Sequence, residues 1–118
     1  MSAGELIAAV DALRPNHYES ARKLRWLAEL DGKLFRECGR EGEAPAETYS
    51  TETVLLAPFP YDQALYTGWL FSQIDLNNAE IGKYNNAAAA FNAAWADFAR
   101  HWTRTHLPLQ QVRRLKLT

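Results

Sequence analysis

The chain has 118 residues, 47% of them hydrophobic and 12% aromatic, and its net charge at pH 7 is −1. This size suits one domain, and enough apolar side chains are present for a core, which excludes a disordered tail. No apolar run is longer than that from Ala87 to Phe91, which is much shorter than the roughly 20 residues of a membrane span, and no basic segment opens the chain. We therefore expect a soluble protein, made in the cytosol without a secretory signal.

The charges are unevenly distributed along the chain. Residues 1–80 carry seven basic and 13 acidic side chains, a net −6, whereas residues 81–118 carry six basic and one acidic side chain, a net +5. Such a split arises either by chance or because identical subunits pack head to tail, with the acidic part of one against the basic part of the next. The sequence leaves both interpretations open.

The first predicted helix runs from about Ala3 to Leu13. Ser2 and Glu5 have the spacing of a capping box, in which each side chain satisfies a backbone N–H at the start of a helix. Pro15 should stop the helix, because a proline disfavours helical angles in the residue before it.

A second helix is predicted to open at Asn16 and Glu19, which repeat the capping-box spacing. The Asp31-Gly32 pair is a local weakness, but the apolar pattern keeps its phase across it, so one helix is preferred over two. Gly39 is the expected C-terminal cap. The apolar stripe consists of Ala21, Leu24, Leu27, Ala28, Leu34, Phe35 and Cys38, widened by Trp26 and Leu30.

A long loop is predicted between the second and third helices. From Gly39 to Thr53 no apolar period is visible, and Pro58 and Pro60 follow a brief apolar stretch, so the loop extends over residues 39–60. Loops of this length are usually functional or disordered.

The third helix is predicted to begin at Asp62 as its N-cap. Its inner face should contain Leu65, Tyr66, Trp69, Leu70, Gln73, Ile74 and Asn77.

A fourth helix should follow after a break near residues 81–83 and end at Pro108. One continuous helix through Ile81 is the alternative, but Asn77, Asn78 and Gly82 are poor helix formers, and so long a helix would not fit a compact domain. The apolar pattern of the fourth helix is Tyr84, Ala88, Phe91, Trp95, Phe98 and Trp102.

No catalytic or metal-binding pattern is present. His101 and His106 are five residues apart, whereas two helical metal ligands are usually four apart, and Cys38, the only cysteine, is expected to be an inert buried thiol. Asp31, Asp75 and Glu80 lie in or beside apolar stripes, where capping or pairing with Arg22, Arg25 or Lys83 is favoured over acid–base catalysis. We therefore expect no enzyme activity, no metal and no cofactor.

Several fragments resemble a group of small proteins encoded in the structural gene modules of long-tailed phages. The fragments are Lys23-Leu24-Arg25-Trp26-Leu27, Leu30-Asp31-Gly32, Pro60-Tyr61-Asp62, Gln73-Ile74-Asp75, Asn77 with Glu80, Tyr84-Asn85-Asn86, Phe91-Asn92 and Arg104-Thr105-His106-Leu107-Pro108. Members of this group are head–tail connector, adaptor or head-completion proteins, helical and non-enzymatic.

The resemblance implies a virion structural protein in the neck, at the head–tail interface. It would form a homo-oligomeric ring beneath the portal protein and join it to tail, stopper or terminator proteins, with possible contact to packaged DNA in the channel and no contact with a membrane. A small DNA-binding or regulatory protein of a phage or prophage is the alternative.

The fold expected from these observations is all-α: a small bundle of about four helices, with residues 1–106 as a single domain and residues 107–118 as an extended docking tail. Candidate contacts with partners or other subunits combine exposed basic and apolar residues near the C-terminus. They are Arg100, Arg104, Leu109, Val112, Arg113, Arg114, Leu115 and Lys116.

Overall fold

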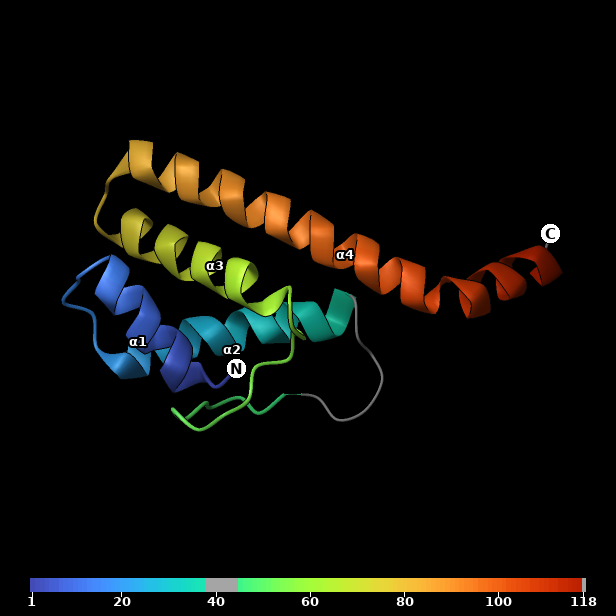
Figure 1. The fold of residues 1–118 in the computed structure, drawn as a ribbon, viewed down its shortest axis with the longest axis horizontal. Helices are drawn as coiled ribbons and strands as arrows, with labels where there is room; N and C mark the ends of the chain where they lie inside the picture. The colour runs from blue at the N-terminus through green and yellow to red at the C-terminus, as the bar shows by residue number, and fades with distance from the viewer. Residues whose placement is uncertain (38–44, 118) are drawn as a thin grey trace.

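The computed structural model describes residues 1–37 and 45–117, and the side chains of residues 1–37 and 45–104. It contains the helices α1 (Ala3–Leu13), α2 (Ser20–Glu37), α3 (Asp62–Asn77) and α4 (Ile81–Leu117), shown in Figure 1. Within the described residues, β-type backbone pairing is limited to a single antiparallel bridge between Ser2 and Val54. The predicted all-α fold of about four helices, with a long connection between the second and third, is confirmed.

The bounds and the cap of α1 agree with the prediction. The Ser2 hydroxyl accepts the backbone N–H of Glu5 at 3.2 Å, which satisfies one of the unpaired donors of the first turn. The hydrogen bond of Glu5 differs from that of the usual capping box, because its carboxylate accepts the Ser2 hydroxyl at 2.9 Å.

The predicted start of α2 is wrong, since the helix begins at Ser20. Asn16 instead builds the turn after α1: its side-chain oxygen accepts the N–H of Tyr18, and its amide donates to the Arg14 carbonyl and to Asp11. These local bonds compete with helical capping. The helix continues through Asp31-Gly32 as predicted. The cap at Gly39 and the position of Cys38 lie outside the described residues.

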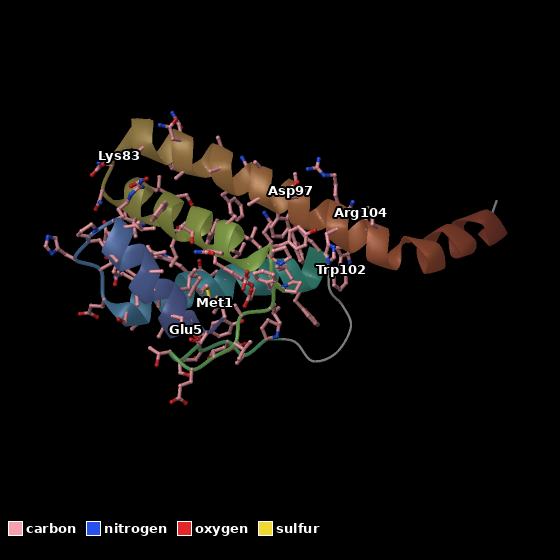
Figure 2. All side chains as sticks on the ribbon, in the orientation of Figure 1. Met1, Glu5, Lys83, Asp97, Trp102 and Arg104 are labelled. Carbon is pink, nitrogen blue, oxygen red and sulfur yellow. The ribbon has the colours of Figure 1, made fainter. Side chains whose placement is uncertain are left out.

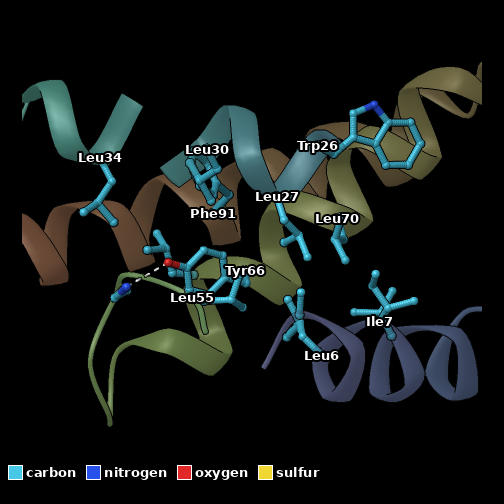
Figure 3. Packing of buried hydrophobic residues seen from close by; sticks show 14 of the residues in the cluster. Leu6, Ile7, Trp26, Leu27, Leu30, Leu34, Leu55, Tyr66, Leu70 and Phe91 are labelled. Atoms are coloured by element: carbon cyan, nitrogen blue, oxygen red, sulfur yellow. Dashed lines mark hydrogen bonds between the residues drawn. The ribbon is translucent and has the colours of Figure 1, made fainter. Parts of the chain in front are cut away.

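The core lies where α1, α2 and α3 meet, with α4 covering α3 (Figure 3). The buried face of α2 is rotated from the predicted stripe: Ala21 is exposed, Leu24, Ala28 and Phe35 are half-buried, and two ionisable side chains, Lys23 and Asp31, are buried. The largest fully buried side chains are Tyr66, Phe98, Leu6, Leu27, Leu30, Leu65, Leu70, Ile74, Val10, Asp31 and Asp75.

The central helix is α3, which contacts the other three helices. Its N-cap is Tyr61, not Asp62. The Asp62 carboxylate accepts the N–H of Gln63 at 2.8 Å from the first position of the helix. Of the predicted inner face, Trp69 and Gln73 are half-buried and Asn77 is exposed.

α3 and α4 form an antiparallel pair. They approach closely at Gly68, where a Cβ atom would lie 3.1 Å from the Phe91 Cα. The separation of the two helices is confirmed, but the break lies at residues 78–80, where Ala79 has a left-handed φ of 59°.

α4 is 37 residues long and continues through Pro108 to Leu117, so the predicted end at Pro108 is wrong. An internal proline removes one backbone hydrogen bond and can bend a helix without ending it. The C-terminal part of α4 extends well beyond the end of α3 (Figure 1). A helix of this length is therefore compatible with a small domain, because its last turns lie outside the bundle.

Candidate functional site

The most buried carboxylate, Asp31, belongs to a polar network that holds the loop against the helices. It is 0% exposed and accepts the hydroxyl of Tyr49 at 2.7 Å, the hydroxyl of Tyr66, and the backbone N–H of Leu56 at 3.2 Å. The Tyr66 hydroxyl also accepts the backbone N–H of Ala57 at 2.8 Å. Every partner of this carboxylate among the described residues is a loop or helix residue that it holds in place, which indicates a structural role.

Burial raises the pKa of Asp31 above its ordinary value of 3.8, and the hydrogen bonds from Tyr66, Tyr49 and Leu56 oppose this effect. Burial likewise raises the pKa of the two tyrosines, with the neighbouring Asp31 adding to the shift. Both phenols therefore stay protonated at neutral pH and act as donors to the carboxylate.

The other buried charges are each paired within the fold. Asp75, 1% exposed, pairs with Arg14, whose guanidinium lies 4.2 Å from the centre of the Phe71 ring. The buried Lys23 ammonium lies 2.7 Å from the Asp11 carboxylate. Buried charges are tolerated when they are paired and hydrogen-bonded.

The carboxylates noted in the sequence are thus dispersed. Glu80 pairs with Lys83 at 2.8 Å, which confirms that predicted pairing, whereas Asp75 pairs with Arg14 and not with Arg22, Arg25 or Lys83. No group of three or more His, Cys, Asp or Glu side chains among the described residues is placed to hold a metal ion.

The histidines have different surroundings. The His101 ring stacks on Tyr61, with ring centres 4.6 Å apart, and His17 is exposed in the connection between α1 and α2. The side chain of His106 lies outside the described part of the chain.

The structure brings together two of the predicted contact residues. Arg100 and Arg104 are exposed and line a surface depression of about 570 Å³ with Tyr61, Asp97 and Thr103, and Arg100 pairs with Asp97. Figure 2 shows Arg104 on the side of α4 opposite Trp102, which packs against the core.

The other six predicted contact residues belong to the C-terminal part of α4, and their side chains lie outside the described part. They are Leu109, Val112, Arg113, Arg114, Leu115 and Lys116.

A surface groove along α2 was not predicted. Two depressions of about 620 and 520 Å³ adjoin at Arg25 and Glu47, which line both, and the segment 45–49 forms their second wall. The missed signal is the width of the apolar stripe: Leu24, Ala28 and Phe35 continue it beyond the part that the core buries. We call the two depressions together the α2 groove.

The loop also carries exposed apolar side chains, some of them beside the N-terminus. Val54 is 71% exposed and Phe59 is 88% exposed, with Met1 and Leu56 more moderately exposed. The backbone N–H of Leu55 donates to the Met1 carbonyl at 3.1 Å, which places Val54 and Leu56 close to the start of the chain.

No protein-family model matches the chain, and neither a curated protein nor a solved structure matches it. No helix in the described part of the structure is long and apolar enough to cross a membrane.

Proposed function

We propose that this chain is a head–tail adaptor of a long-tailed phage, a non-enzymatic protein that forms a ring beneath the portal and joins the capsid to the tail. The proposal starts from the resemblance of the sequence fragments. One structural observation supports it most directly: the sign of the charge changes where α4 begins. α4 carries six basic side chains and one acidic one, whereas the residues before it are net −6.

The change of charge at the start of α4 supports the head-to-tail interpretation. Six of the 13 basic residues belong to one helix that extends past the bundle, together with a single acidic residue, whereas 13 of the 14 acidic residues precede that helix (Figure 1). A copy that presents α4 to the bundle of the next copy would bring opposite charges together, and head-to-tail contacts of this kind close into rings.

The proposal is tested by co-expression with the portal protein encoded by the same genome. We expect the two proteins to sediment together and to give a ring below the portal in negatively stained electron micrographs. A chain that stays monomeric with the portal at micromolar concentration would contradict the proposal. Portal and capsid genes upstream of this gene would support it independently.

A DNA-binding regulator is the second candidate, because Arg100 and Arg104 are exposed four residues apart on one face of α4. Phosphate contacts release counterions, so such binding would weaken about tenfold or more between roughly 50 and 200 mM salt. A fluorescence-anisotropy titration with duplex DNA measures this. No binding at the lower salt concentration would remove this candidate.

A further inference from the structure

The loop segment 49–57, which we call the strap, joins the start of α1 to α2 and α3. Its contact with α1 is made by the backbone: the N–H groups of Ala3 and Gly4 donate to the carbonyls of Thr53 and Thr51 at 2.8 and 2.9 Å. These bonds satisfy two of the donors that the first turn of a helix leaves unpaired. The strap therefore caps α1 in addition to connecting α2 with α3.

One side of the strap is part of the core. Tyr49, Leu55 and Ala57 are buried, whereas Val54 and Leu56 are exposed. The alternation from residue 54 to residue 57 is that of an extended segment with one face against the helices. Removing the strap from the helices would therefore expose the three buried side chains and the helix residues beneath them.

One carboxylate holds the strap to the helices at two separate points. Asp31 of α2 accepts the Tyr49 hydroxyl at 2.7 Å and the Leu56 N–H at 3.2 Å. Its third donor is the hydroxyl of Tyr66 in α3, which also accepts the N–H of Ala57 at 2.8 Å. Because both points share one acceptor, the loss of Asp31 weakens both at the same time.

The closed strap keeps this carboxylate away from water. Its donors among the described residues are two phenols and one backbone N–H, all of them neutral, whereas the buried Asp75 is paired with Arg14. A buried carboxylate without a cationic partner is costly, and opening the strap would return Asp31 to water and recover part of this cost.

The helices depend less on the strap than the strap depends on them. Each helix has its own i→i−4 backbone hydrogen bonds, whereas the strap is held largely by bonds to α1, α2 and α3. Segments of this kind can open locally at a lower free energy than the global unfolding of the protein.

We propose that the strap opens as one unit, held closed by Asp31, while α2, α3 and α4 remain folded. The open form exposes the buried side chains Tyr49, Leu55 and Ala57. A partner that binds only the open form would shift the population towards it. The inference does not depend on the proposed adaptor function.

Native-state hydrogen exchange, followed by NMR on the full chain, tests the opening. The amides of Gly4, Leu55 and Ala57 should share one opening free energy, lower than that of Leu70 in the middle of α3. It should also depend less on urea concentration, because local opening exposes less surface than global unfolding. Equal opening free energies for the strap and for Leu70 would overturn the proposal, since the strap would then open only when the whole protein unfolds.

Two matched tyrosine variants test how the strap is held. Tyr49→Phe removes a bond that exists only in the closed strap, so exchange at Gly4, which does not contact Tyr49, should accelerate about tenfold. Tyr18→Phe removes the hydroxyl bond to Asn78 at 2.6 Å, which lies outside the strap and survives its opening, so exchange at Gly4 should not change. Acceleration by both variants would indicate global unfolding, and no acceleration by Tyr49→Phe would mean that the strap is not one unit.

Asp31→Asn tests whether the two attachment points are coupled. Exchange at Gly4 and at Ala57 should accelerate by the same factor, about tenfold or more, because the whole strap loses its common acceptor. Acceleration at Ala57 alone would show that the two ends of the strap open separately and would contradict the proposal.

Discussion

Asp31 is a single side chain that joins three segments distant in the sequence. It accepts from Tyr49 and Leu56 of the loop and from Tyr66 of α3. An acceptor shared by buried donors is costly to remove, because each donor left without a partner costs about 1–3 kcal/mol.

Asp31→Ala should therefore lower the free energy of unfolding by about 3 kcal/mol or more, since two tyrosine hydroxyls and one backbone N–H lose their acceptor. Urea denaturation followed by circular dichroism measures this loss. The matched control is Glu29→Ala, an exposed carboxylate on the same helix, which should change the stability by less than about 0.5 kcal/mol. Similar losses in both variants would show that the network contributes little.

The raised pKa of Asp31 also predicts how stability depends on pH. The folded state holds the Asp31 proton more tightly than the unfolded state does. The protonated carboxyl therefore adds to the free energy of unfolding below pH 3.8, and this contribution is lost as the pH rises through the raised folded pKa. The difference in unfolding free energy between the wild type and Asp31→Asn should consequently become less favourable to the wild type as the pH rises from about 4 to 7. Denaturation series at several pH values check this; the opposite slope would mean that the hydrogen bonds outweigh burial.

At the scale of the elements, the contact between α3 and α4 depends on Gly68. Gly68→Leu should destabilise the fold by about 1–3 kcal/mol, because the new side chain would meet the backbone of Phe91, which cannot move without shifting the helix. Gly82→Ala is the matched control: a Cβ there meets nothing within 4 Å, so the variant should be as stable as the wild type or slightly more stable. Thermal unfolding of both variants measures the difference.

Elements were predicted correctly where residues adjacent in the sequence determine them, and less well where distant contacts do. α1 was predicted correctly because the Ser2 cap and the turn before Pro15 lie next to it in the sequence. The start of α2 was missed because Asn16 bonds to Asp11 and Tyr18, partners that capping spacing does not reveal. The buried face of α2 was predicted wrongly because Lys23 and Asp31 are buried. Partners elsewhere in the fold make this burial possible, whereas hydropathy alone predicts that both side chains are exposed.

The candidate site was predictable only in part, for the same reason. The exposure of Arg100 and Arg104 followed from the helical pattern of α4, since both lie opposite its apolar stripe. The α2 groove depends on where the segment 45–49 runs relative to α2, and the sequence carries no signal for that placement.

At the scale of the whole molecule, the bundle should fold without the last turns of α4. Deleting residues 109–118 removes no side chain of the described core, so helicity per residue and the thermal midpoint should stay close to those of the full chain. Binding to the portal should be lost if α4 provides the contact. Pull-down with immobilised portal measures this. A truncated chain that still assembles normally would contradict the proposed role of these residues.

The position of the charges gives the molecule a large electric dipole in spite of its small net charge. The overall charge is −1, yet α4 is net +5 and the remaining chain is net −6, and α4 carries its charge beyond the bundle. Two such molecules attract each other in some orientations and repel in others, and salt screens this over about 10 Å at 0.1 M. The colloidal behaviour of the protein should therefore depend on ionic strength far more than its isoelectric point near 6.3 suggests, and near a polyanionic surface the molecule should orient with α4 towards it.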